Sequence, residues 1–115
     1  MAAILPLAVS VGDPDGIGPE VSLRAASAFR GGPVELYGDA TALQRLASRL
    51  APSAAGPLPA IVHVGDWDGV ARGAPSAAGG RAQLLALGAA ADAVRAGRAR
   101  ALVTGPTSKA AITAT

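Results

Sequence analysis

The chain has 115 residues, of which 50% are hydrophobic and 16% are charged, and its formal net charge at neutral pH is +2. High hydrophobicity combined with few charges excludes an intrinsically disordered protein. Aromatic residues make up only 3% of the chain, so it lacks the stacking side chains, as well as the extended basic face, that are typical of nucleic-acid-binding proteins.

Short apolar runs alternate with longer stretches of helical periodicity along the chain. The first run, residues 3–11, is too short to cross a membrane and is predicted to be a buried parallel strand. The elements predicted after it are helix 19–30, strand 33–38, helix 40–51, strand 60–64, helix 79–97, strand 100–104 and a helix that begins near residue 107. Segments 52–59 and 65–79 are rich in Pro, Gly, Ala and Ser and are predicted to be loops. This alternation predicts one α/β unit over residues 1–115, with parallel-type βα connections.

Two of the predicted helices have apolar stripes that indicate a core-facing side. The stripe of helix 40–51 consists of Leu43, Leu46 and Leu50, and that of helix 79–97 of Leu84, Leu87, Ala91 and Val94. Because aromatic residues are scarce and alanines are abundant, each helix buries little apolar area. We therefore expect this unit to be only marginally stable by itself.

The first predicted strand is followed by the loop Gly-Asp-Pro-Asp-Gly-Ile-Gly-Pro-Glu, residues 12–20. Gly12, Gly16 and Gly18 have no Cβ, so the backbone can adopt positive φ angles or lie directly against a ligand. The spacing of the glycines does not match the dinucleotide fingerprint. These residues could form no more than a tight turn. However, the loop is longer than a plain connection needs and carries two acidic side chains, which favours a ligand-binding loop.

The last predicted strand is followed by a second loop, Thr-Gly-Pro-Thr-Ser-Lys, residues 104–109. Thr104 and Ser108 offer hydroxyl groups, Gly105 permits close approach of the backbone, and Lys109 supplies a mobile cation for a phosphate or carboxylate. Alternatively, Thr104 or Ser108 caps the next helix and Lys109 is a solvated surface charge. Both loops follow strands, and the carboxyl ends of parallel strands form the usual ligand-binding edge of an α/β sheet.

Two motifs taken together resemble the 4-hydroxythreonine-4-phosphate dehydrogenase family of vitamin B6 biosynthesis. They are Gly-Asp-Pro-Asp-Gly-Ile-Gly-Pro-Glu near the start and Ala-Leu-Val-Thr-Gly-Pro-Thr-Ser-Lys near the end. The segment Gly-Ala-Pro-Ser-Ala-Ala-Gly-Gly, residues 73–80, is similar to the middle part of the same region. Isopropylmalate and isocitrate dehydrogenases have a related first loop without the Pro14-Asp15 insertion. Asp15 stands where a small residue is commoner, which leaves open a paralogue acting on another phosphorylated hydroxy acid.

The resemblance implies an isocitrate/isopropylmalate dehydrogenase-like α/β fold, of which this chain is the N-terminal part. It also implies NAD-dependent oxidation, with decarboxylation, of 4-phosphohydroxy-L-threonine or a related phosphorylated hydroxy acid. A divalent metal (Zn, Mg or Co) would be held by histidines that lie outside this chain, and the complete enzyme would be a homodimer. On this basis we assign cofactor binding to Gly12, Asp13, Gly16 and Gly18, substrate binding to Thr104, Gly105 and Pro106, and catalysis to Lys109.

Two further residues have competing interpretations. His63 is the only histidine and lies in an apolar segment, so we predict a structural role rather than metal binding. Trp67, between two aspartates, could stack on a ligand, but a single aromatic residue in a loop more often anchors packing.

The competing function is that of a non-catalytic product, either a truncated chain or a module that binds small anions. The chain contains no cysteine, and its start lacks the features of a secretory signal, so we expect a cytoplasmic protein with no membrane partner.

Overall fold

The computed structural model describes residues 4–50, 58–68, 70 and 73–113. Helices and strands alternate in the order β1 (Leu7–Ser10), α1 (Gly18–Ala28), β2 (Val34–Gly38), α2 (Ala40–Arg49), β3 (Ala60–His63), α3 (Ala77–Arg95), β4 (Ala101–Thr104) and α4 (Lys109–Thr113). The strands form one parallel sheet in the order β3-β2-β1-β4. The predicted parallel α/β fold is therefore confirmed.

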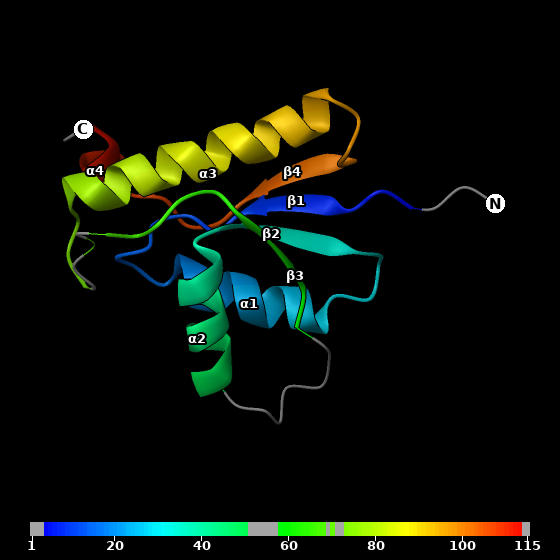
Figure 1. Cartoon of the computed structure of the whole chain (residues 1–115), viewed down its shortest axis with the longest axis horizontal. Coiled ribbons are helices and arrows are strands. Elements are labelled where there is room, and N and C mark those ends of the chain that lie inside the picture. Colours follow the sequence, from blue (N-terminus) through cyan, green and yellow to red (C-terminus); the bar gives the residue numbers. More distant parts are fainter. Residues whose placement is uncertain (1–3, 51–57, 69, 71–72, 114–115) are drawn as a thin grey trace.

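The sheet is the middle of three layers. Helices α1 and α2 lie on one face of the sheet, and α3 lies on the other face with α4 beside its N-terminal end (Figure 1). Within the described residues, no helix is both long and apolar enough to span a membrane.

The limits of several elements differ from the predicted ones for local reasons. Strand β1 begins at Leu7, because the preceding Pro6 has no N–H to donate to the sheet. The Pro6 carbonyl still accepts a hydrogen bond from the Arg100 N–H. Helix α3 begins at residue 77 rather than 79, because Ser76 caps it by accepting the Gly79 N–H. It ends at Arg95, two residues before Gly97, whose φ of 78° lies in the left-handed region that ends helices.

The core between α3 and the sheet is made mostly of alanine. Its buried members are Ala8, Tyr37, Ala86, Ala90, Ala93 and Ala99. The stripe predicted for this helix is therefore wrong in part: Val94 packs against this core, but Leu84 is 44% exposed and the fully buried positions are occupied by alanines. Side chains this small let the helix axis approach the sheet closely, so that larger side chains remain at its flanks.

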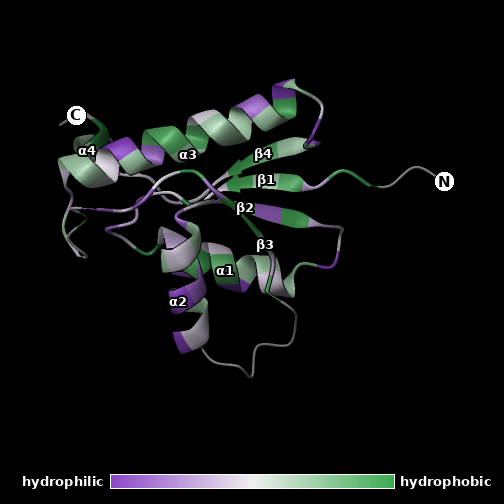
Figure 2. Cartoon of the chain, in the orientation of Figure 1, coloured by the Kyte–Doolittle hydropathy of each residue, from purple (hydrophilic) through white to green (hydrophobic). Residues whose placement is uncertain are grey.

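The second core lies between the sheet and the other two helices. It contains Val11, Leu23, Leu36, Leu43 and Leu46, with Leu50 and Trp67 packed against it. The predicted stripe of Leu43, Leu46 and Leu50 is thus confirmed. Figure 2 shows the strands as largely hydrophobic, while the side of α2 facing the viewer is mainly hydrophilic.

Candidate functional site

Both predicted ligand loops lie at the carboxyl edge of the sheet, after neighbouring strands. Strand β1 pairs with β2 on one side and with β4 on the other, so the chain order reverses between β1 and β4. Such a reversal is a topological switch point, where connections leave in opposite directions and ligands of open α/β proteins bind. The first loop, which connects β1 to α1, and the second loop, which connects β4 to α4, meet at this point.

The two loops contact one another through their backbones. The Asp13 N–H donates to the Pro106 carbonyl at 2.8 Å, and the Gly105 N–H donates to the Ser10 carbonyl at 2.7 Å. Gly12 has a φ of 84°, and a Cβ there would overlap the Pro106 carbonyl oxygen. A Cβ on Gly18 would overlap the carbonyl oxygen of Val11. Packing against the second loop is therefore sufficient to require glycine at position 12, and packing against the Val11 backbone is sufficient at position 18.

Asp13 organises the interior of the first loop. Its Oδ1 accepts the Asp15 N–H at 3.0 Å, and its carbonyl accepts the Gly16 N–H at 3.0 Å. Gly12, Asp13 and Gly18 are buried, whereas Gly16 is half-buried and Ile17 is 68% exposed. In this conformation, Gly16 and Ile17 form the part of the loop that a cofactor can reach. The assignment of this loop to cofactor binding stays a prediction.

Asp15 connects the first loop to the start of α3. The Ser76 hydroxyl donates to Asp15 Oδ2 at 2.8 Å while its oxygen accepts the Gly79 N–H. A Cβ on Gly79 would overlap Asp15 Oδ2, so glycine makes room for the carboxylate. The partial positive charge at the N-terminus of α3 favours this buried anion. The sequence analysis places Ser76 in a predicted loop. Serine is a preferred N-cap residue, so its position just before an apolar helical stretch could have revealed that α3 begins here, beside Asp15.

The second loop presents its polar groups at the surface. Thr104, Pro106 and Lys109 are exposed, and Gly105 is half-buried. The Ser108 hydroxyl accepts the Ala111 N–H at 3.2 Å, which is the capping role considered as the alternative for this residue. Within the described residues, Lys109 forms no ion pair. The structure thus brings Gly105 and Pro106 against the first loop, while Thr104 ends β4 and Lys109 begins α4 on either side of them.

An apolar groove of about 250 Å³ lies beside the second loop, between α1 and strands β1 and β4. Val9, Val21, Phe29 and Val103 contribute to its walls, and Thr104 to Pro106 form one end. Such walls cannot solvate a phosphate or carboxylate, because burying an unpaired charge is costly. The groove therefore does not suit an anionic group, which would have to lie on the polar surface of the loop.

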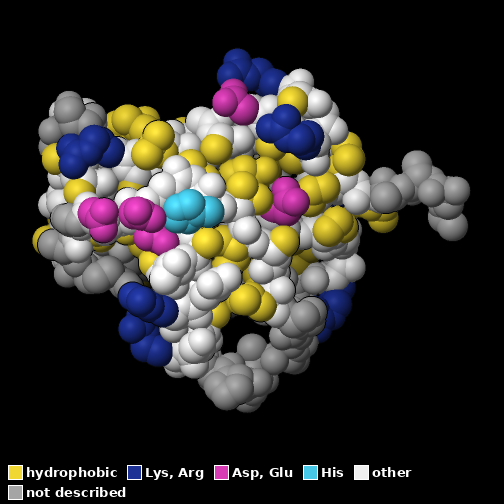
Figure 3. Space-filling view, viewed as in Figure 1, with side chains coloured by type: hydrophobic (Ala, Val, Ile, Leu, Met, Phe, Trp, Pro, Cys, Tyr) yellow, Lys and Arg dark blue, Asp and Glu magenta, His cyan; other side chains and the backbone are white. Residues whose placement is uncertain are grey.

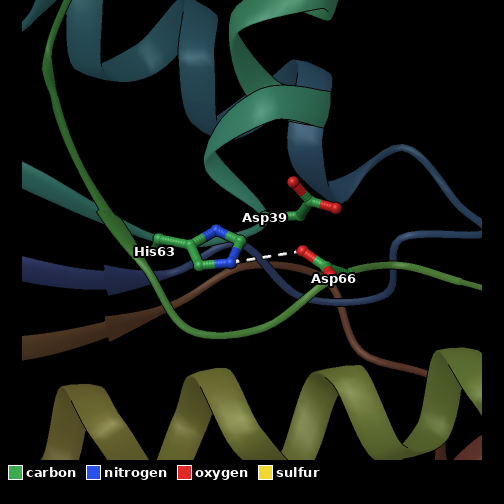
Figure 4. A group of neighbouring side chains, drawn as sticks. All are labelled: Asp39, His63 and Asp66. Atoms are coloured by element: carbon green, nitrogen blue, oxygen red, sulfur yellow. Dashed lines mark ion pairs between the residues drawn. The ribbon is translucent and has the colours of Figure 1, made fainter.

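A second group of polar residues was missed by sequence reasoning. Asp39, at the start of α2, His63, at the end of β3, and Asp66, in the following loop, place ligand atoms within 4.8 Å of one another (Figure 4). His63 Nε2 lies 3.3 Å from Asp66 Oδ1. On the face drawn in Figure 3, the histidine side chain is at the surface with acidic side chains beside it.

The hydrogen bonds of this group test whether it fits a divalent metal. Asp39 Oδ1 accepts the Ala42 N–H, and its Oδ2 accepts the Trp67 N–H at 2.8 Å. His63 Nδ1 accepts the Ala40 N–H at 3.0 Å, so a neutral imidazole carries its hydrogen on Nε2, the nitrogen that lies 3.3 Å from Asp66 Oδ1. A metal-bound histidine instead donates through its second nitrogen. The arrangement does not fit a metal ion and joins β2, α2 and β3 instead.

A parallel α/β sheet with two loops that meet at its switch point is the architecture of open α/β proteins, a class in which ligands commonly bind at this edge. No family model matches the chain. It is 37% identical over 127 residues to the 4-hydroxythreonine-4-phosphate dehydrogenase of Methylorubrum populi, covering 94% of this chain and 36% of that protein. It is 35% identical over 117 residues to the enzyme of the same name from Zymomonas mobilis, covering 91% of this chain and 35% of that protein.

Comparison with solved structures finds enzymes of the same name. The crystal structure of 4-hydroxythreonine-4-phosphate dehydrogenase from Klebsiella pneumoniae matches with a TM-score of 0.76 at 28% identity, covering 96% of this chain and 39% of that one. The corresponding enzyme from Burkholderia phymatum has a TM-score of 0.76 at 23% identity, which shows the shared fold alone. The resemblance to the N-terminal part of the 4-hydroxythreonine-4-phosphate dehydrogenases is confirmed. The chain spans little more than a third of the length of the curated relatives it matches.

Proposed function

We propose that this chain supplies the N-terminal α/β unit of a dehydrogenase that oxidises 4-phosphohydroxy-L-threonine, or a related phosphorylated hydroxy acid, with NAD and loss of carbon dioxide. Such a reaction belongs to pyridoxal 5'-phosphate biosynthesis. The observation that carries the proposal is the meeting of the two family-like loops at the switch point, through the hydrogen bond from Asp13 to Pro106. The dehydrogenase name of the relatives supports the reaction class.

In this proposal, the second loop binds an anionic part of the substrate. Lys109 is exposed one turn beyond the end of β4, where its ammonium group can approach a phosphate or carboxylate. The exposed Thr104 hydroxyl and the backbone at Gly105 and Pro106 would orient that group. NAD would accept the hydride when bound, and the first loop would contact it at Gly16.

The metal of this reaction would be held by residues outside this chain, since Asp39, His63 and Asp66 do not fit one. We therefore propose that the 115-residue chain by itself has no dehydrogenase activity and that the complete enzyme is a homodimer. Metal-dependent formation of NADH by the purified chain, after removal of contaminating host enzyme, would refute the first part of this proposal.

A chimera tests the function of the loops directly. This chain would replace the matching N-terminal segment of the Methylorubrum populi enzyme, and NADH formation would be followed at saturating metal. We expect activity, and a decrease in kcat/KM of at least about tenfold for Lys109→Ala, which corresponds to roughly 1.4 kcal/mol of transition-state stabilisation. The melting temperature should change little, because an exposed lysine contributes little to stability.

The chimera also distinguishes the proposed dehydrogenase function from the competing function of a non-catalytic module. A folded, dimeric chimera that binds inorganic phosphate through Lys109 but forms no NADH would favour the non-catalytic anion-binding module. An early-melting Lys109→Ala variant with full kcat/KM would instead identify Lys109 as structural, and the second loop as only a helix start.

A further inference from the structure

Gln83 is an unusual residue for its position on α3. The other buried residues of this helix are glycines and alanines, whereas Gln83 is only 3% exposed and carries an amide. Its Oε1 accepts the Ser108 N–H at 2.8 Å. Its Nε2 has no hydrogen-bond partner among the described residues. Burying an amide with one group unpaired costs free energy, so this side chain is poorly explained by packing alone.

The residue that donates to Gln83 is Ser108, which immediately precedes Lys109. The backbone N–H of Ser108 is fixed by Gln83, and the hydroxyl of Ser108 caps the Ala111 N–H. Helix α4 has only five residues, and Ala111 is its buried one. Because so short a helix has little intrinsic stability, its position depends on contacts with α3. Gln83 therefore holds the backbone from which the Lys109 side chain extends.

The same end of α3 also holds the first loop. Ser76 donates to Asp15, and Gly79 makes room for the Asp15 carboxylate. Gly79 and Gln83 are four residues apart and so lie on one face of the helix. The bond from Asp13 to Pro106 then joins the two loops directly. The first two turns of α3 are thus a common support for both loops.

We propose that Gln83 is a positioning residue that sets the Lys109 loop for anion binding. This inference rests on the proposed function, because it assigns to Lys109 the anion that the second loop would bind. Gln83 itself touches no ligand. It acts by fixing the Ser108 backbone, and removing its acceptor oxygen lets the start of α4 move relative to the first loop.

The experiment uses the 115-residue chain and inorganic phosphate as the probe. Gln83→Met keeps the length of the side chain, removes the acceptor and also removes the unpaired Nε2, so the variant should fold. Gln83→Glu keeps an acceptor oxygen but adds an acidic group near the proposed anion site, so only its Ser108 exchange, and not its phosphate affinity, is compared with that of Gln83→Met. Gln44→Met, at an exposed position of α2, is the matched control. Amide hydrogen exchange of Ser108 and the phosphate Kd, followed through the Lys109 amide signal, are measured for each variant.

We expect Gln83→Met to accelerate Ser108 exchange and to weaken phosphate binding, each by about tenfold or more. Gln83→Glu should keep the slow Ser108 exchange of the wild type, and Gln44→Met should match the wild type in both measurements. Equal acceleration of Ser108 exchange in Gln83→Glu and Gln83→Met would overturn the proposal, because the acceptor oxygen would then not matter. A phosphate affinity that depends on Lys109 but is unchanged in Gln83→Met would overturn the positioning role alone. Equal phosphate binding by wild type and Lys109→Ala would overturn the proposed anion site and the positioning role with it.

Discussion

Gly12 shows how one residue controls the approach of the two loops. Its φ of 84° is unfavourable for any residue with a side chain, and a Cβ would also overlap the carbonyl oxygen of Pro106. We expect Gly12→Ala to lower the free energy of unfolding by at least about 2 kcal/mol, since backbone strain and a steric clash add. Urea unfolding followed by the fluorescence of Trp67 measures this change.

Gly16→Ala is the matched control in the same loop, because the nearest atom to its Cβ would be at an ordinary contact distance of 3.7 Å. It should change the free energy of unfolding by less than about 1 kcal/mol. Equal effects of the two substitutions would show that close loop packing is not the reason for glycine at position 12.

Tyr37, the only tyrosine, provides a test of pH dependence. Burial raises the Tyr37 pKa above its ordinary value of 10.0. The negative charge of Glu35, and the hydrogen bond that the tyrosine donates to it, raise this pKa further, while Arg98 opposes the shift. Since the folded pKa exceeds the unfolded one, this contribution to stability is complete below the unfolded pKa and is lost as pH rises through the folded pKa.

We therefore expect the native phenol to ionise at higher pH than the phenol in urea, as measured by absorbance at 295 nm. Glu35→Gln should move the native pKa down, because it removes the neighbouring charge. Coincident titrations of native and unfolded protein would contradict the buried environment of Tyr37.

At the scale of elements, α3 is where the sequence pattern was misleading. Ala90 is fully buried against the sheet, whereas Leu84 is 44% exposed. We expect Ala90→Leu to destabilise the protein by about 1–3 kcal/mol, because there is no room for added methylenes. Leu84→Ala should change the unfolding free energy by only about 0.5 kcal/mol. Thermal or urea unfolding of both variants checks the order, and the reverse order would support the leucine stripe.

Three features could be predicted from the sequence, because each depends on local periodicity or on strand direction. They are the alternation of strands and helices, the leucine stripe of α2 and the position of both loops at one sheet edge. The contacts within the site could not. Gln83 and Ser108 are separated by 25 residues, and Asp39 and the Trp67 N–H by 28. Such pairs depend on the order of strands in the sheet, which reverses between β1 and β4. The face of α3 depends on how closely alanine lets it approach the strands.

At the scale of the whole molecule, β4 is an edge strand with an unprotected surface. It ends the strand order, and all four of its residues, Ala101 to Thr104, are exposed and uncharged. Within the described part of the chain, β4 pairs only with β1, so its outer edge, with the apolar groove beside it, is suited to pairing with another strand. We therefore expect the 115-residue chain to self-associate or to have low stability.

Sedimentation over a range of concentrations tests this expectation. Val103→Lys, which places a charge on the exposed edge, should shift the chain toward monomer, because charged side chains on edge strands oppose pairing. Leu84→Lys, at a similarly exposed position on α3, is the control and should leave association unchanged. A strict monomer with a sharp, reversible melt above about 65 °C, beyond the range of ordinary domains, would contradict the expectation. An equal response to both lysines would place the contact away from β4.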